Sequence, residues 1–536
     1  MSKREDTTFS PMRGYVALIL HAHLPFVRHP EHERFLEESW LYEAISESYL
    51  PLLRVLQGWH RDGIAARLTL TVSPTLCAML QDPLLKDRYL RNLETLIDLA
   101  ERETHRTHWE RPFHDLAQLY LHRFRENRAT WLGCHGDLVA ALREFQDLGY
   151  LEIITTAATH ALLPLLAAHP SSIRGQILTA RDDYRRCFGR DPRGIWLPEC
   201  AYVHGLEQTL QEAGLRWFMV DTHGLLHATP RPRHGVFAPV FTPNGLAAFG
   251  RDLDSAKQVW SRQAGYPGDG RYRDFYRDIG FDLEFDYVRP ALPSPDLRGF
   301  TGIKYHRIAC DPQGEKQIYR PDEAWQAADQ HAGHFLGARI EQTHRLADIL
   351  GRPPLLVCPY DAELFGHWWY EGPTFLDLFM RKSACDQDVF RLITPFEYLR
   401  ENPTQQVATP AESTWGEEGY YRVWLNETNE WIVPHLDVAM ERMHALARRF
   451  PDPAPLLRRA LNQAARELLL AQSSDWPFIL RTGTNPGYAR QRVTQHLLRF
   501  IDLHDQLTAT RIDEARLAAI EASDNLFPDI DFRRWA

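Results

Sequence analysis

Short apolar runs that end in polar or charged residues recur along this chain and limit its possible folds. Six runs show the pattern: Ala17–Leu20 before His21, Leu68–Val72 before Ser73, Leu151–Thr156 before His160, Gly194–Pro198 before Glu199, Trp217–Val220 before Asp221, and Leu355–Tyr360 before Asp361. Helical periodicity marks segments between several of them, such as 83–104 and 115–128. Nearly all-apolar strands alternating with helices are typical of a parallel sheet covered on both faces. The pattern therefore predicts an α/β catalytic domain, either a β/α barrel or an open sheet, with polar residues gathered where the strands end.

Two stretches depart from this pattern. Residues 223–274 are rich in Pro and Gly and lack long helical periodicity, which predicts a small inserted, loop-rich subdomain overhanging the active site. After residue 402, helical patterns at 431–450, 455–472 and 486–507 are typical of a helix bundle. We therefore expect a catalytic domain of residues 14–222 and 275–401, the insertion at 223–274, and a C-terminal helical domain of residues 402–536.

The charge and cysteine content narrow the choice of partners. A formal charge of −10 argues against nucleic acid or an anionic membrane, because binding phosphates needs a concentrated basic face. The seven cysteines are scattered without a CxxC pair, so neither a disulfide framework nor a cysteine zinc site is indicated. The apolar run at 16–20 is too short for a signal peptide or a membrane span. We expect a cytoplasmic protein whose substrate is neutral, such as a sugar polymer.

Two acidic residues at the ends of different strands could carry catalysis. Glu199 lies in WLPECAY and Asp361 in PYDAELFGHWWYEG. A carboxylate in such a place could also cap a helix or pair with an Arg, but that does not explain the Trp-Trp-Tyr run at 368–370. A nucleophile and an acid/base among aromatic platforms are the requirements of glycosidic cleavage, and retaining enzymes hold the two carboxyl groups about 5–5.5 Å apart.

Other side chains suit sugar binding or, alternatively, a metal. Indole rings stack on the C–H faces of sugars, and five tryptophans lie in polar, glycine-containing segments: Trp260, Trp368, Trp369, Trp415 and Trp476. His21 and His23 share one face of a strand, which also suits a zinc-dependent hydrolase or deacetylase, the alternative of a different class. Because no further close-spaced ligand pair follows, we expect these histidines to bond sugar hydroxyls and no metal to be needed.

Taken together, these segments resemble glycoside hydrolase family 57 and, within it, the α-1,4-glucan branching enzymes. The resemblance rests on HAHLP at 21–25, AATHALLP at 157–164, WLPECAY at 196–202, FGRD and GYPGD at 249–252 and 265–269, PYDAELFGHWWYEGP at 359–373, and ELLLAQSSDWPF at 467–478. It implies an incomplete seven-stranded β/α barrel, a small inserted domain and a C-terminal α-helical domain. It also implies a retaining mechanism without a cofactor or a catalytic metal.

The resemblance also implies roles for individual residues. Glu199 would be the nucleophile and Asp361 the acid/base. Substrate contacts would fall on Arg251, Gly268, Trp415 and Asp475, and His21, His23, His160 and Trp260 look like further cleft residues.

The implied activity is that of a 1,4-α-glucan branching enzyme, which cleaves an α-1,4 link and forms an α-1,6 branch in glycogen or another α-glucan. An α-amylase or a 4-α-glucanotransferase with the same catalytic pair stays open. Similar branching enzymes carry a loop Tyr that shields the covalent intermediate from water, whereas this sequence has no Tyr between Tyr202 and Tyr266.

Overall fold

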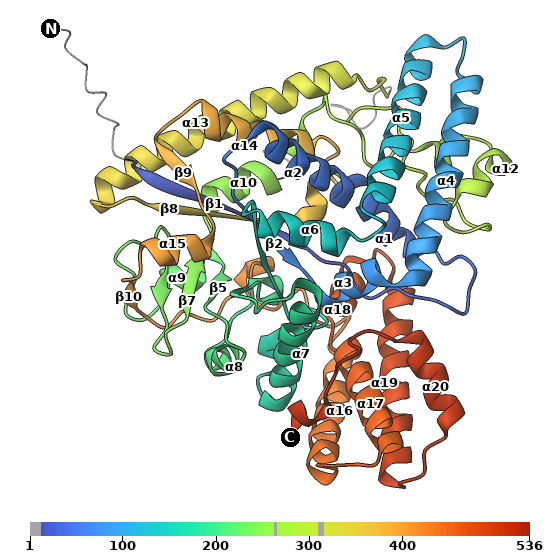
Figure 1. Cartoon of the computed structure of the whole chain (residues 1–536), viewed down its shortest axis with the longest axis vertical. Helices are drawn as coiled ribbons and strands as arrows, with labels where there is room; N and C mark the ends of the chain where they lie inside the picture. The colour runs from blue at the N-terminus through green and yellow to red at the C-terminus, as the bar shows by residue number, and fades with distance from the viewer. Residues whose placement is uncertain (1–11, 262–264, 309–315) are drawn as a thin grey trace.

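The computed structural model describes residues 12–261, 265–308 and 316–536. Strands surrounded by helices form the upper part of the molecule in Figure 1, and helices alone form the lower part. Within the described residues, no helix is both long enough and apolar enough to cross a membrane.

Seven parallel strands build the centre of the upper part. Their spatial order is β8 (Leu355–Asp361), β1 (Gly14–Ala22), β2 (Leu68–Val72), β3 (Leu151–Ile154), β4 (Gly194–Ile195), β5 (Trp217–Val220) and β7 (Ala247–Gly250). The bridge between Thr155 and Ile195 joins the sheet that ends at β3 to the sheet that begins at β4. A backbone hydrogen bond of 2.8 Å from Asp252 N–H to the Val357 oxygen connects the end of β7 to β8, although no ladder joins these strands in the described part of the chain. The strands form an incomplete barrel with all carboxyl ends at one end, as the resemblance implies, whereas the pattern of apolar runs alone is also compatible with an open sheet.

Alternate residues of these strands pack into two different cores. Ala17 and Ile19 of β1 pack with Leu355 and Val357 of β8 in a core inside the barrel. The residues between them in sequence pack outward, into the large core shared with the surrounding helices. Since side chains alternate along a strand, the next residue of the inner set is His21 on β1.

Helices cover the outside of the barrel. They are α1 (Glu38–Ala44), α2 (Leu50–Asp62), α3 (Pro74–Gln81), α4 (Pro83–Arg106), α5 (Arg111–Gly133), α6 (Leu138–Asp147), α7 (Pro170–Phe188), α8 (Leu206–Glu212), α9 (Thr222–Leu226), α10 (Leu253–Trp260), α11 (Ile279–Asp282), α12 (Phe285–Val288), α13 (Pro321–Leu350), α14 (Gly372–Cys385) and α15 (Pro395–Glu401). The described residues contain three further, short strands: β6 (Val240–Phe241), β9 (Phe390–Leu392) and β10 (Gln406–Val407).

The stretch at 223–274 differs from the prediction of a separate loop-rich insertion. It contains β7, which pairs in parallel with β5 and belongs to the barrel, and the helix α10. The four residues of β7, Ala-Ala-Phe-Gly, carry too few bulky apolar side chains to stand out among the surrounding Pro and Gly residues. Residues 262–264 of this stretch lie outside the described residues.

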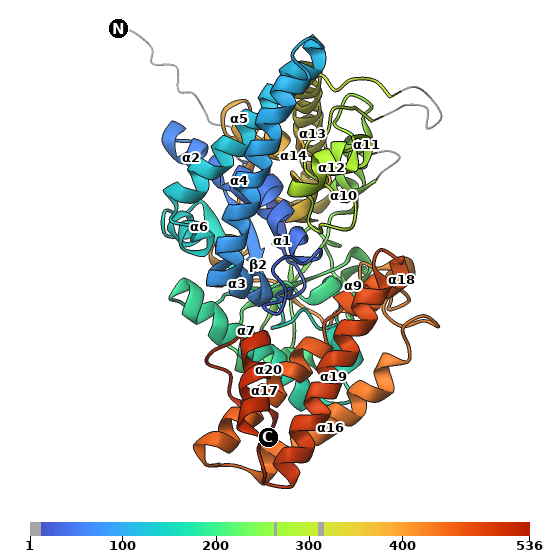
Figure 2. The same ribbon diagram turned by 90° about the vertical axis from the view of Figure 1, so that its right-hand side faces the viewer.

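The C-terminal region is helical, as predicted. Its helices are α16 (Ile432–Arg449), α17 (Pro455–Ala471), α18 (Asp475–Thr482), α19 (Pro486–Thr508) and α20 (Glu514–Ser523). In Figure 2, α16, α17 and α19 form the lower part of the molecule, while α18 lies above them, towards the barrel. The buried ring of Trp535 packs on Gly175 of α7, where an added Cβ would lie 2.2 Å from the ring, so the chain end docks closely on the barrel.

Candidate active site

A cavity of about 560 Å³ lies at the carboxyl ends of the barrel strands. It is lined by nine of the ten predicted site residues: His21, His23, His160, Glu199, Arg251, Trp260, Trp415, Asp475 and Asp361. Gly268 is the exception, since it lies in a short 3-10 helix (Tyr266–Gly268) and is not among the described residues that line the cavity. The remaining lining residues are Leu24, Glu363, Trp368, Gly416, Val423, Trp424 and Phe478.

Strand register explains why distant residues meet here. His21 pairs directly with Asp361 across β1 and β8, and both continue the inward-facing sets of their strands. Arg251 follows Ala247 and Phe249 of β7 in the same way. A period of two therefore places these three side chains at the inner rim of the barrel.

The backbone at Glu199 is strained. Glu199 has φ 59° and ψ 24°, a left-handed conformation that costs a residue with a side chain on the order of 1–3 kcal/mol. The loop is held in place by backbone hydrogen bonds from Trp415 N–H to the Glu199 oxygen (3.1 Å) and from Tyr202 N–H to the Ser413 oxygen (2.9 Å). The surrounding structure thus forces the carboxylate towards the cavity.

Two hydrogen bonds favour the ionised form of Glu199. Trp415 Nε1–H donates to its Oε2 at 2.8 Å, and the Ser474 hydroxyl donates to its Oε1 at 3.0 Å. Burial outweighs them and raises the pKa of Glu199 to about 7. With this pKa, Glu199 is mostly ionised only above about pH 7.

Asp361 holds its proton more firmly. Burial raises its pKa well above the ordinary value, and the nearby charges of Glu363 and Glu199 raise it further, while Arg251 opposes them. In the described part of the chain, no side-chain hydrogen bond to its carboxylate offsets this effect. As the pH falls, Asp361 therefore takes up its proton before Glu199 does. This order suits a general acid beside an ionised nucleophile.

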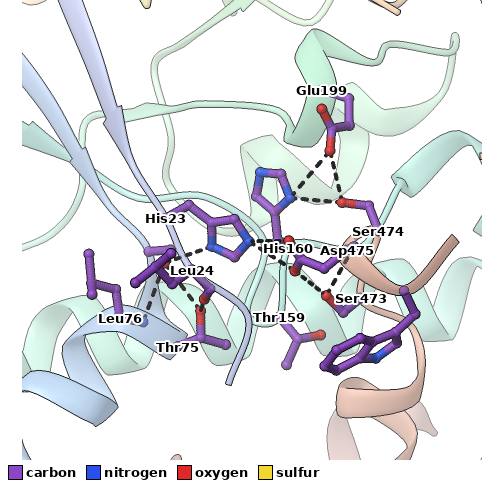
Figure 3. Close-up of polar contacts among 12 residues, drawn as sticks. His23, Leu24, Thr75, Leu76, Thr159, His160, Glu199, Ser473, Ser474 and Asp475 are labelled. Atoms are coloured by element: carbon purple, nitrogen blue, oxygen red, sulfur yellow. Dashed lines mark hydrogen bonds and ion pairs between the residues drawn. The ribbon is translucent and has the colours of Figure 1, made fainter. Parts of the chain in front are cut away.

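Two histidines, His23 and His160, connect the barrel to the C-terminal region (Figure 3). His23 Nε2 lies 3.0 Å from Asp475 Oδ2, and its Nδ1 lies 2.9 Å from the Ser73 hydroxyl. His160 bonds to His21 through the two Nε2 atoms (2.9 Å) and to the Ser474 hydroxyl through Nδ1 (2.9 Å). Asp475 and Ser474, at the start of α18, thereby close one side of the cavity.

Protonation follows from the burial of this cluster. Burial lowers the pKa of both His21 and His160 well below its usual value, so both rings are neutral at neutral pH. Burial opposes ionisation of Asp475, but His23 outweighs it and keeps the pKa of this carboxyl below its usual value. Because the His160 ring is neutral, its 3.7 Å contact with Glu199, through Nδ1, is not an ion pair. The neutral histidines and the carboxylates can instead form hydrogen bonds with the hydroxyl groups of a ligand.

The same cluster contains one of the two groups of described residues that could hold a metal ion, the other being Glu467, His496 and Asp524 in the helical C-terminal region. His23, His160 and Asp475 each offer a donor atom within 4.8 Å of the others, whereas His21, on which the zinc alternative also rests, is not in this group. These side chains already have hydrogen-bond partners: His23 bonds to Asp475 and Ser73, and His160 bonds to Ser474 and His21. This pairing suits a hydrogen-bonding wall, and elemental analysis of the purified protein would reveal a bound metal.

Aromatic rings form the other walls of the cavity. Trp415 contacts Trp196 and Trp260 edge to face, with ring centroids 5.2 and 5.8 Å apart. Trp369 and Trp476, by contrast, are almost fully buried and belong to the core, which corrects the prediction that they line the cleft. The Trp476 indole N–H donates to the Leu470 oxygen at 2.8 Å.

Sequence reasoning did not assign Glu363, Val423, Trp424 or Phe478 to the site. Glu363 stands two residues after Asp361, and its carboxylate accepts hydrogen bonds from the Tyr49 hydroxyl (2.5 Å) and the His23 backbone N–H (3.2 Å). The other three come from loops and helices of the C-terminal half, where no strand pattern indicates a direction.

The chain matches two known protein families. Residues 17–411 match the family described as glycosyl hydrolase family 57, and residues 435–535 match the C-terminal domain of 1,4-alpha-glucan branching enzymes. The chain is 32% identical to a 1,4-alpha-glucan branching enzyme of Thermococcus kodakarensis over 96% of its own length and 78% of that protein.

Two solved structures are similar to this chain over nearly its whole length. An alpha-amylase of Thermotoga maritima is 43% identical, with a TM-score of 0.92 over 98% of this chain and 99% of that one. A family 57 branching enzyme of Pyrococcus horikoshii is 32% identical, with a TM-score of 0.88 over 98% of this chain and 97% of the other.

Proposed function

The chain belongs to glycosyl hydrolase family 57, and on this premise we propose that it is a 1,4-α-glucan branching enzyme that works by a retaining mechanism. One observation carries the proposal: the same cavity is lined by Glu199 and Asp361 and by Asp475 and Phe478 of the region that matches the branching-enzyme C-terminal domain. The substrate is an α-glucan such as amylose or a glycogen-like polymer.

The first half of the reaction breaks the α-1,4 link. A carboxylate oxygen of Glu199 attacks the anomeric carbon, and the electron pair of the breaking bond passes to the departing glycosidic oxygen. Asp361 gives its proton to that oxygen, which leaves as a free 4-hydroxyl. Trp415 and Ser474 hold the nucleophile, because both donate hydrogen bonds to its carboxylate.

The second half forms the branch. Asp361, now ionised, removes the proton from the 6-hydroxyl of an acceptor glucan, whose oxygen attacks the anomeric carbon. Glu199 leaves as a carboxylate, and the new bond is α-1,6. His23, His160 and Asp475 are placed to bond sugar hydroxyls, and the indoles of Trp415 and Trp260 to stack on sugar rings.

We expect incubation of amylose with the protein to produce α-1,6 linkages, counted by proton NMR, without a matching rise in reducing ends. The alternatives are an α-amylase, which the Thermotoga maritima structure favours, and a 4-α-glucanotransferase. New reducing ends without branches would establish the first, and redistributed linear chains the second. A boiled sample serves as the control.

The pH dependence of kcat/KM should report the two carboxyl groups. Activity should rise with pH through a pKa of about 7, as Glu199 becomes ionised, and fall at higher pH as Asp361 loses its proton. Trp415→Phe keeps a ring but removes the hydrogen bond to Glu199, so the acidic limb should move to higher pH. Initial rates measured across pH check this, and an acidic limb that stays in place or moves to lower pH contradicts it.

The proposal extends to the domain organisation of the chain. Residues 14–222 and 275–401, joined by β7 from the predicted insertion at 223–274, would form the catalytic unit, and residues 402–536 the helical domain. The C-terminal domain match at 435–535 supports this division.

We also propose a role in glycogen or α-glucan synthesis in the cytoplasm. This location is supported by six free cysteines in the described residues.

A further inference from the structure

We propose that an aromatic platform, which begins at the edge of the catalytic cavity and extends beyond it, binds a distal segment of the α-1,4-glucan chain. The platform consists of Trp368, Phe275, Tyr276, Phe300 and Phe281. This inference rests on the proposed function and deepens it, since it names a second contact for the same polymer.

The platform is continuous with the cavity. Trp368 lines the cavity and is 53% exposed. The ring of Phe275 stacks on Trp368 with centroids 4.5 Å apart and planes 24° apart. Tyr276 stands almost perpendicular to Phe275, at 5.1 Å and 88°, and is 64% exposed. A glucan leaving the cavity over Trp368 would therefore meet further rings at once.

Two more rings extend the surface. Phe300 lies 5.5 Å from Phe275, and Phe281 lies 5.2 Å from Phe300, both measured between ring centroids. Phe281 is also well exposed. Phe275 and Phe300 are half-buried and link the exposed rings of Trp368, Tyr276 and Phe281 into one aromatic patch. An exposed apolar patch of this kind is characteristic of a binding surface.

The platform is held rigid from beneath. The buried ammonium of Lys304 lies 4.3 Å from the Phe275 ring centre and 4.4 Å from the Phe300 ring centre, and it donates a hydrogen bond to the Phe275 backbone oxygen (2.6 Å). His367 packs edge-on against Phe275 at 5.2 Å and is itself held by Glu47, with its Nδ1 2.9 Å from the carboxylate. Rings fixed before binding lose little entropy when a ligand arrives.

The chemistry of the surface favours a neutral sugar chain. Its exposed rings offer planar apolar faces, which match the C–H faces of glucose units. The arginines close in sequence are engaged elsewhere, since Arg277 pairs with Asp282 and Arg298 donates to the oxygens of Gly280 and Leu283. Continuity with the cavity then identifies the occupant as the glucan whose reacting part lies beside Glu199.

Tyr276→Ala is the direct test, since this exposed side chain can be removed without disturbing the core. Affinities for amylose and for maltotriose are measured by titration calorimetry in a Glu199→Gln background, where the ligand is not consumed. Affinity for amylose should fall by about fivefold, while that for maltotriose stays the same, because a short chain held in the cavity does not reach the platform.

Two matched variants sharpen the result. Tyr276→Phe keeps the ring and should bind amylose like the parent, which separates stacking from loss of the hydroxyl. Trp109→Ala removes a 90% exposed ring that lies between α4 and α5 and is not part of the platform, so it should leave both affinities unchanged.

Unchanged amylose affinity in Tyr276→Ala would overturn the platform, as would an equal loss for both ligands. Neither result would contradict the proposed branching activity, because the branching assay on the active protein tests that activity separately. If the parent binds no glucan at all, both fail together.

Discussion

Replacing Glu199 with Ala is expected to reduce turnover of amylose by at least about 10⁴-fold. The reason is that the covalent route loses its nucleophile, while Asp361 alone cannot form a glycosyl intermediate. Initial rates of glucan cleavage and branching measure the loss. Circular dichroism should show an unchanged fold, because the substitution removes a side chain that lines the cavity and is not part of the barrel core.

Azide distinguishes a missing nucleophile from general damage. The cavity left by Glu199→Ala admits a small anion, which attacks the anomeric carbon from the vacated side and gives a product of inverted configuration, a β-glycosyl azide. We expect azide to restore turnover in this variant and to leave the parent unaffected. Full activity of Glu199→Ala without azide would remove the residue from the mechanism, and so would a rescued product that keeps the α configuration.

Replacing Asp361 with Asn should reduce turnover of amylose by about 10²–10⁴-fold. In this variant Glu199 can still attack the anomeric carbon of the substrate, but no group protonates the departing glycosidic oxygen or activates the acceptor. A donor that carries fluoride as the leaving group needs no proton for the first step. With α-maltosyl fluoride, therefore, formation of the glycosyl-enzyme should be largely restored, as a burst of released fluoride would show.

Glu363→Gln is the matched control for Asp361. Glu363 is a second carboxylate of the same cavity, two residues along the chain, and is held by Tyr49 and His23. It should keep most of the turnover. Because its charge helps to raise the pKa of Asp361, the alkaline limb of the kcat/KM profile should move to lower pH in this variant. Loss of activity in Glu363→Gln as large as in Asp361→Asn would reassign the acid/base.

Most elements of the barrel could be predicted from local pattern. The run 68–72 is β2 and the run 217–220 is β5, with the predicted limits, and the bundle helices at 432–449 and 455–471 begin and end within a residue of prediction. These segments bury a regular set of side chains, so their periodicity is visible without any partner. Strand β7 was not recognised as a barrel strand, because a strand of four mostly small residues is stabilised by pairing with β5 and not by its own composition.

The chemistry of the site depended more on the fold. Trp368 and Trp369 are neighbours in a motif rich in aromatic residues, yet the first lines the cavity and the second is buried in the core. Ser474 and Asp475 reach the barrel from the helical domain, where they contact Glu199 and His23. Such contacts join residues hundreds of positions apart, so no local sequence pattern predicts them.

The amino-acid sequence by itself determined which residue types stand at the ends of the strands, and with them the α/β class and the candidate pair Glu199 and Asp361. This was possible because strand periodicity and the motifs around the two acids are local properties of the chain. Only the tertiary structure showed what sets the pKa of each of these carboxyl groups. Burial, hydrogen bonds from Trp415 and Ser474 to one acid, and repulsion from Glu363 at the other arise only when distant segments pack around a common cavity.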